Sequence, residues 1–344
     1  MRGVDSFLAV KRQTALKTPQ TQAALSTGDF LAFNNESMSA AQQIISNPSI
    51  RRRAMQSRAF TAMGTKEASG NIEFTASNFV LDTLLPLIFH DKTGDADDAD
   101  GAVYTLEDGG SVAPFTTFVG FNSESDGKFV RKFYGCKVNT ASFSARVDDF
   151  LRLSLGVVAI GHENEEYTAL PTYHTTEAEY AFNFIHASIS IQAGDMSTLV
   201  KLPVESIDFN INHNIDTNSY RLGDYHRNSL EEGMTDVDGT FTLDMGTKGF
   251  EGEALALSGA THQADFLERI AAEARFASFE LVFEDPTNTV DDGGSGVPSV
   301  LKIEIPHARL ETPSFNVTDA GRISGSARFI AYDTMTVTHV SNLA

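Results

Sequence analysis

One pattern occurs twice in this chain. The stretch Gly64–Phe74 has two glycines separated by five residues and then apolar residues at alternate positions, and it recurs about 170 residues later as Gly233–Leu243. Two further pairs of segments align in the same order at a nearly equal offset: Lys137–Phe143 with Arg309–Phe315, and Ser154–Ile160 with Ser326–Tyr332. Their common order and spacing indicate duplication of a domain of about 130–140 residues.

The elements expected around these anchors also occur twice. Ser77 and Thr261 are candidate N-caps, each followed by apolar residues at helical spacing, so each half predicts one short helix. Pro86 is expected to kink or shorten the first helix. Strands are predicted over 113–121, 129–133, 138–145 and 151–160, and over 276–283, 300–305, 309–317 and 323–332. The expected fold is therefore mainly β, with two tandem β-sandwich or barrel domains that each carry one flanking α-helix.

Charge is unevenly distributed along the chain. Residues 1–66 hold nine basic and three acidic groups, although the whole chain has a net charge of −20. Such a segment could bind nucleic acid or dock on the acidic face of a neighbouring copy, and its lack of interleaved aromatic residues favours the second interpretation. We expect an extended arm over 1–32 that contacts another subunit, a first domain over 33–165, a linker with a bridging strand over 166–202, and a second domain over 203–344.

Several classes of protein are excluded by composition. The single cysteine, Cys136, rules out an intramolecular disulfide framework and a four-cysteine zinc site. The longest nearly uninterrupted apolar run, Leu153–Ile160, is far shorter than the roughly 20 residues of a membrane helix. The first residues lack the pattern of a secretory signal. The negative net charge disfavours tight, sequence-independent binding to nucleic acid.

The acidic loop over 96–107 partly matches a calcium-binding EF-hand loop. Asp98, Asp100, Gly101 and Glu107 have the required spacing, but Ala96 stands where the first ligand is needed. A strand is also expected after the loop, where an EF-hand has a helix. We therefore expect a solvated acidic hairpin and no metal requirement.

No other set of residues has the spacing of a catalytic or ligand-binding motif. The nine histidines are scattered, and His162 lacks the second histidine that a helical zinc motif requires. Cys136 has no partner visible in the sequence, and the carboxylate pairs Asp148–Asp149 and Glu231–Glu232 are typical of turns and surfaces. We expect no catalytic, cofactor-binding or metal-binding residues and no enzymatic activity.

The order of these elements resembles that of a known family. A strand, a G-x5-G unit, a helix and a strand ending in a segment such as 135–144 are similar to the tail tube (major tail) proteins of long-tailed phages. In the second half, 204–214, 220–223 and 233–245 resemble the same family. The likeness covers roughly residues 30–335 and depends on dispersed apolar and glycine positions rather than on one motif.

The resemblance implies a structural protein of the virion tail, siphovirus-like, that polymerises into stacked rings. The rings would form a hollow tube through which DNA passes without specific binding, and related secretion tubes share this architecture. The resemblance also implies assembly in the host cytoplasm and partners that include other tail proteins such as the tape measure. Most family members carry one tube domain per chain, so a duplicated chain is expected to form a homotrimer ring with pseudo-six-fold symmetry.

A duplicated β-sandwich module that binds carbohydrate or a receptor is the competing hypothesis. Such a module would have a concave site lined by aromatic residues. The chain has no Trp, and its 25 Phe fall mostly at alternating strand positions that are expected in the core. These features favour the structural role.

Overall fold

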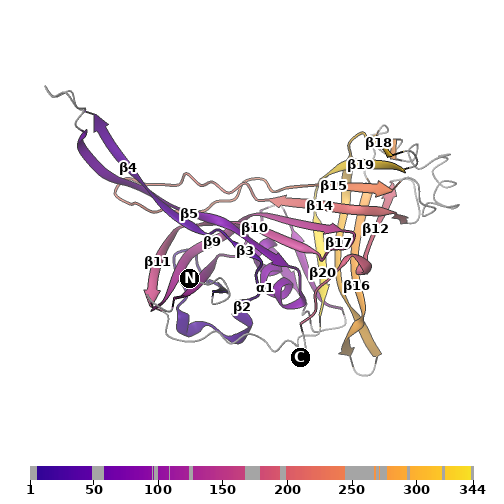
Figure 1. Cartoon of the computed structure of the whole chain (residues 1–344), viewed down its shortest axis with the longest axis horizontal. Helices are drawn as coiled ribbons and strands as arrows, with labels where there is room; N and C mark the ends of the chain where they lie inside the picture. Colours follow the sequence, from indigo (N-terminus) through magenta and orange to yellow (C-terminus); the bar gives the residue numbers. More distant parts are fainter. Residues whose placement is uncertain are drawn as a thin grey trace.

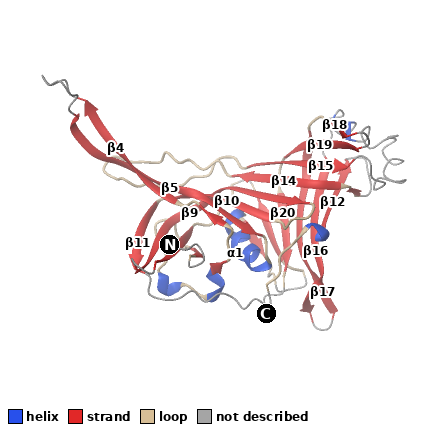
Figure 2. Cartoon of the chain, viewed as in Figure 1, coloured by secondary structure: helices blue, strands red, loops and turns tan. Residues whose placement is uncertain are grey.

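The computed structural model is built almost entirely from antiparallel strands (Figure 1; Figure 2). The mainly-β prediction is confirmed, and the described strands do not close into a barrel. The structure describes residues 6–48, 58–94, 96, 100–107, 109–123, 127–166, 179–193, 199–244, 267–268, 271, 277–292, 295–319 and 322–341. In this part of the chain, no helix is long and apolar enough to cross a membrane.

The elements follow the chain in two series. The first half contains the strands β1 (Phe7–Arg12), β2 (Phe30–Leu31), β3 (Asn35–Glu36), β4 (Ser39–Pro48), β5 (Arg58–Thr75), β6 (Asp91–Thr93), β7 (Ala102–Leu106), β8 (Phe115–Ser123), β9 (Gly127–Arg146), β10 (Arg152–Ala159) and β11 (Gly161–Glu166). The second half contains β12 (Ala187–Ala193), β13 (Val200–Leu202), β14 (Val204–Asn212), β15 (Asp236–Asp244), β16 (Ala277–Asp292), β17 (Ser295–Leu310), β18 (Ser314–Asp319), β19 (Arg322–Ala331) and β20 (Met335–Val340). The helices are η2 (Gln22–Ala24), η3 (Thr27–Asp29), α1 (Asn78–Ile88) and η4 (Phe184–His186).

The two halves pair their strands in the same order. One sheet of the first half has the order β2-β1-β8-β9-β11, and its counterpart in the second half has the order β13-β12-β16-β17-β20. The strands of the sequence repeat form β4-β5-β10-β9 in the first half and β14-β15-β19-β18 in the second. Gly70 therefore pairs with Val157 as Gly239 pairs with Phe329.

Close packing explains the second glycine of each G-x5-G unit. A Cβ atom on Gly70 would lie 2.5 Å from the Cα of Met38, and one on Gly239 would lie 2.5 Å from the ring of Phe329. A larger residue at either position would push the neighbouring strand or ring away. The repeat in the sequence thus marks a repeated close approach in the structure.

Strand β9 joins the two halves into one sheet. Its first part pairs with β8 and β11, and its last part pairs with β10 and β14. Gly135 has a φ of 59° within this strand, a conformation that favours glycine. The strands predicted over 129–133 and 138–145 are parts of this one long strand, which continues through Gly135. The resulting central sheet has the order β4-β5-β10-β9-β14-β15-β19-β18 (Figure 1).

Helix α1 begins where the sequence predicts. The hydroxyl of Ser77 accepts a hydrogen bond from the backbone N–H of Val80 (3.4 Å). Pro86 lies in the last turn of the helix, which ends at Ile88. The second helix predicted after Thr261 lies mostly outside the described residues, although Leu267, Glu268 and Ala271 are helical.

Two segments that the sequence places outside the two domains form strands of the sheets. Strand β1 lies in the expected arm, yet it pairs with β8 of its own chain and is buried from Phe7 to Val10. Strand β12 lies in 166–202, where a linker with a bridging strand is expected, and it pairs with β13 and β16. Phe7–Arg12 therefore forms an inner strand of its own chain's sheet. Its apolar run, only four residues long, gives a period-2 signal too short to reveal its partner.

Candidate functional site

The central sheet has one buried and one polar face. Along β14, Ile207, Phe209 and Ile211 are buried, whereas Asp208 and Asn210 alternate with them on the other side. The same alternation holds in the neighbouring strands. The polar face comprises Ser69, Asn71, Glu73, Thr140, Ser142, Ser144, Arg146, Arg152, Ser154, Asp208, Asn210, Asn212, Asp236, Asp238, Thr240, Thr242, Ser324, Ser326 and Arg328.

The charges of the polar face are few and mostly paired. Arg146 lies 3.6 Å from Asp208, Arg152 lies 3.0 Å from Asp149, and Arg328 lies 3.0 Å from Asp238. Each of the face's arginines thus has a carboxylate partner. The strong net charge of −20 is therefore not concentrated on this face, whose described residues are mainly Ser, Thr and Asn.

The junction between the halves is well packed. Phe143 of β9 stands opposite Phe209 of β14, and their rings stack with centroids 4.7 Å apart at 1°. Both side chains are 2% exposed. On the polar side, the hydroxyl of Ser142 donates a hydrogen bond to the side-chain oxygen of Asn210. Apolar stacking on one face and hydrogen bonding on the other hold this antiparallel pair together.

The outer strands of the central sheet have unpaired edges. Among the described residues, β4 pairs only with β5, and β18 pairs only with β19. The N–H of Ser37 donates to the carbonyl of Asn71 on β5. By strand alternation, the N–H of Ala40 points away from β5 toward the free edge. The N–H of Met38 instead donates to Glu36 Oε2 at 3.0 Å, and the carbonyl of Met38 accepts from Arg131 at 3.1 Å. Such edges form a template for another strand.

These edges correspond to the two strands of the internal junction. Strand β18 pairs with β19 in the second half as β9 pairs with β10 in the first. In these two pairs, Phe315 of β18 holds the position of Phe143 in β9, and Ser314 holds the position of Ser142. Matching pairing partners also place Ser39 of β4 where Asn210 lies in β14. Phe315 is only half-buried, unlike Phe143. The chain therefore carries one completed junction and both sides of a second.

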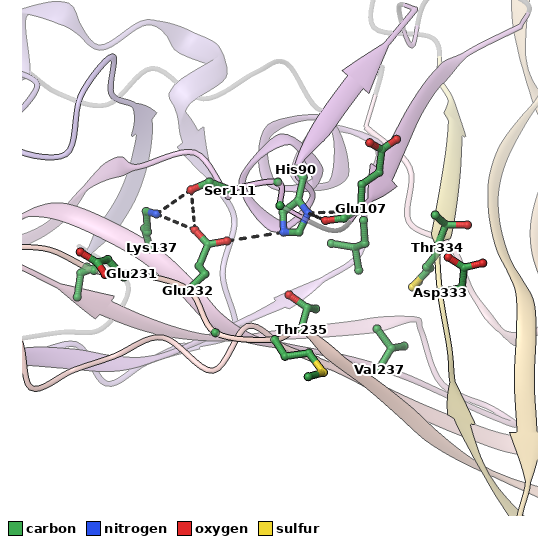
Figure 3. A pocket seen from close by; sticks show the side chains of 17 residues that line it. His90, Glu107, Ser111, Lys137, Glu231, Glu232, Thr235, Val237, Asp333 and Thr334 are labelled. Atoms are coloured by element: carbon green, nitrogen blue, oxygen red, sulfur yellow. Dashed lines mark hydrogen bonds and ion pairs between the residues drawn. The ribbon is translucent and has the colours of Figure 1, made fainter.

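A buried ionic cluster lies between the halves, around Glu232 (Figure 3). Lys137 Nζ and Ser111 Oγ both donate to Glu232 Oε1, at 2.6 and 2.8 Å. The N–H of Val112 donates to the same carboxylate at 3.1 Å. His90 Nε2 lies 3.6 Å from Glu232 Oε2. Burial raises the pKa of Glu232, but these hydrogen bonds and Lys137 outweigh it and lower the pKa overall.

Two histidine rings face each other beside this carboxylate. The rings of His90 and His213 have centroids 5.7 Å apart. Burial lowers the pKa of His213 to about 4, while the charge of Glu232 and the carbonyl of Ile88 oppose that shift. Four residues of the cluster line a cavity of 650 Å³ between β7, β20 and the segment before β15: His90, Ser111, Lys137 and Glu232.

The sequence predicts turn and surface positions for Asp148–Asp149 and Glu231–Glu232, and this holds for the first pair but not for Glu232. Asp149 lies in the turn after β9 and pairs with Arg152. Glu232 is not a surface residue, since its side chain is 8% exposed. Its partner Lys137 lies far away in the sequence, so spacing offers no sign of the pair. Asp98 lies outside the described residues, and Ala102–Leu106 forms a strand, as expected.

Cys136 provides a simple test of the core. The residue is fully buried, and burial raises the pKa of its thiol to about 12. We expect no reaction of the native protein with the thiol reagent DTNB at about pH 8, where a thiol of pKa about 8.5 would react readily. One equivalent should react after unfolding in guanidinium chloride. Reaction of the native protein at the rate of the unfolded chain would contradict this position.

A sheet with one polar face and, within the described part of the chain, two unpaired edges can pair edge to edge with further copies. The comparisons with known proteins agree with a structural protein that assembles with itself. The family model "Phage tail tube protein" matches residues 3–297. The chain therefore belongs to the phage tail tube protein family. Its role is structural: it is a component of the virion tail that assembles with itself into the tube and associates with other tail proteins.

Two solved structures are similar over about half of the chain. A chain of the cryo-EM structure of the anti-feeding prophage (AFP) baseplate is 11% identical, with a TM-score of 0.31, and the match covers 44% of this chain and 91% of that chain. The SPP1 tail tube is 15% identical, with a TM-score of 0.24, and the match covers 49% and 81% of the respective chains. No curated protein sequence is significantly similar to the chain.

Proposed function

We propose that three chains close into one ring of the tail tube by pairing β18 of each chain with β4 of the next. The observation that supports this most directly is the internal junction between β9 and β14. The free edges of β18 and β4 are the counterparts of those two strands. An interface that repeats by a fixed rotation ends in a ring or a helix. Because each of the three chains contributes two similar halves, the ring has three-fold symmetry and approximates a six-fold ring of half-chains.

The internal junction also predicts the register between chains. Because Ser142 stands opposite Asn210 and Phe143 opposite Phe209, Ser314 would stand opposite Ser39 of the neighbouring chain. Phe315 would stand opposite Met38 in the same way. The half-buried ring of Phe315 would then gain the apolar cover that Phe143 receives within the chain.

In this ring, the polar face lines the channel. The opposite face is covered by the core and α1, so the polar face is the side left to water. DNA would pass it without specific binding, because each arginine of this face already has a carboxylate partner. Small Ser, Thr and Asn side chains offer no cluster of cations to hold phosphates.

The hairpin of β4 and β5 is suited to contacts between stacked rings. It projects away from the body of the chain (Figure 1). Ile44, Ile45 and Met63 on it are 69%, 59% and 59% exposed. Exposed apolar side chains on a projecting element mark an interaction surface. The assembled tube would enclose the tape measure protein and form in the host cytoplasm.

Cysteine cross-linking tests the proposed ring. In a chain with Ser39→Cys and Ser314→Cys, oxidation is expected to give covalent dimers and closed trimers on a non-reducing gel. Directly opposite residues of an antiparallel pair have Cβ atoms about 4.5–5.5 Å apart, near the range of a disulfide. The two positions lie on opposite edges of the central sheet, so the disulfide must join two chains. Cys136 is buried and adds no background.

A register-shifted variant serves as the control. Ala41 lies two residues from Ser39 on the same side of β4, and the pair Ala41→Cys with Ser314→Cys should cross-link much less. Equal cross-linking of both pairs would contradict the register. Assembled tubes that show no cross-link, or a covalent product that grows to six chains, would contradict the ring of three.

A further inference from the structure

Three potential metal ligands converge where the two halves of the chain meet. His90, His213 and Glu232 each offer one ligand atom, and these atoms all lie within 4.8 Å of one another. His90 follows α1 in the first half, whereas His213 follows β14 and Glu232 precedes β15 in the second half. All three belong to one chain, so the cluster does not depend on how chains assemble.

We propose that His90, His213 and Glu232 form a binding site for a divalent transition-metal ion, with zinc as the best fit. The ligands would be the Nε2 atoms of the two histidines and the Oε2 atom of Glu232. Two imidazoles and one carboxylate are a donor set that zinc accepts, and three protein ligands leave a fourth position open. The site would fasten the first half of the chain to the second.

The imidazole nitrogens that would bind the ion have no hydrogen-bond partner. Neither His90 Nε2 nor His213 Nε2 forms a hydrogen bond, although the carbonyl of Ile88 acts electrostatically on the His213 ring. His213 is 0% exposed. A buried polar atom without a partner is costly, and most such atoms in folded proteins are satisfied. An ion bound to both nitrogens would satisfy them together.

The remaining polar atoms of these side chains are held in place, as in metal sites. His90 Nδ1 lies 2.9 Å from the carbonyl oxygen of Glu107 and 3.2 Å from the N–H of the same residue. His213 Nδ1 lies 3.1 Å from Thr235 Oγ1. Metal binding requires the tautomer with the proton on Nδ1, which the Glu107 carbonyl and Thr235 Oγ1 can accept, so that each ring presents the lone pair of Nε2 to the ion. Such bonds to the second nitrogen orient histidine ligands and set their tautomer.

Lys137 does not bind the carboxylate oxygen that is proposed as the metal ligand. It binds Glu232 Oε1 at 2.6 Å, while Oε2 faces His90 Nε2 at 3.6 Å. Ligand atoms of a tetrahedral zinc site are about 3.4 Å apart, because each bond is about 2.0–2.1 Å long. The His90–Glu232 separation is close to that value. The cavity of 650 Å³ beside the cluster has room for water at the fourth position.

Metal binding by the purified full-length chain tests this site. Protein freed of metal with a chelator and then equilibrated with excess zinc should retain one zinc ion per chain after desalting. Its melting temperature should rise with zinc, because an ion that binds only the folded state stabilises it. Cobalt(II) in place of zinc should give the visible absorption of a low-coordinate site with nitrogen and oxygen ligands.

The variants His90→Gln and His213→Gln should lose the bound zinc and the rise in melting temperature, and His226→Gln should keep both. Circular dichroism establishes that each variant is folded. The cobalt spectrum of the unaltered chain gives a readout that needs no variant. Absence of retained zinc and of the cobalt absorption in the unaltered chain would overturn the proposal. So would zinc binding that is unchanged when both histidines are replaced in a folded protein.

Discussion

Replacing Phe209 with alanine is expected to lower the free energy of unfolding of the monomer by about 3–5 kcal/mol. The ring of Phe209 is 2% exposed and stacks on Phe143 at 4.7 Å, so its loss leaves a cavity at the junction between the halves. The two strands are tethered in one chain and form this junction in every monomer. Urea unfolding followed by circular dichroism measures the effect, at a protein concentration below that of assembly.

The matched control is Phe315→Ala at the free edge. Phe315 is half-buried in the single chain, so the expected loss in the monomer is only about 1 kcal/mol, a part of the 1.5–3 kcal/mol gained by fully burying such a side chain. The same variant should weaken tube assembly, because the proposed neighbour covers this ring. Equal losses of monomer stability at Phe209 and Phe315 would show that Phe315 is already packed within the single chain, and would contradict an open junction at β18.

Proline at position 40 is expected to weaken tube formation strongly while leaving the monomer folded. The N–H of Ala40 points away from β5, so Ala40→Pro removes no hydrogen bond within the chain, and proline is tolerated on such an edge. In the ring it removes one hydrogen bond, worth about 1 kcal/mol, from each of the three proposed junctions. Its ring also obstructs the approaching strand. The concentration needed for assembly should rise at least about tenfold, since 1.4 kcal/mol corresponds to a factor of ten.

Sedimentation velocity and negative-stain microscopy compare this variant with Ala40→Ser, which keeps the N–H. The serine variant should form tubes of normal length. Normal tubes of Ala40→Pro would rule out β4 as the edge that joins chains. An unfolded Ala40→Pro monomer would show that the N–H of residue 40 is used within the chain.

The repeat was visible in the sequence because it depends on local requirements. Gly70 and Gly239 are needed where a Cβ would collide with Met38 or Phe329, and alternating apolar residues are needed wherever a sheet has one buried face. Ser77 caps α1 for an equally local reason. These features made the mainly-β fold and the start of the helix predictable.

The place of β1 and the buried state of Glu232 were not predictable in this way. Phe7–Arg12 is too short to reveal which strand it pairs with, and Glu232 resembles any surface carboxylate until Lys137 and Ser111 are placed beside it. His90 and His213 likewise carry no motif, because their spacing in the chain is unrelated to their separation in space. Each of these arrangements depends on partners from distant segments.

The sequence by itself determined the duplicated pattern, the dominance of strands and the resemblance to tail tube proteins, because periodicity and glycine positions reflect the geometry of single strands and their nearest neighbours. Only the tertiary structure decided that β9 pairs with β14, that β4 and β18 have no second partner strand among the residues described, and that two histidines meet Glu232. Strand order and side-chain clusters arise from the burial of surfaces contributed by segments far apart in the chain, and no local pattern specifies which of those surfaces meet.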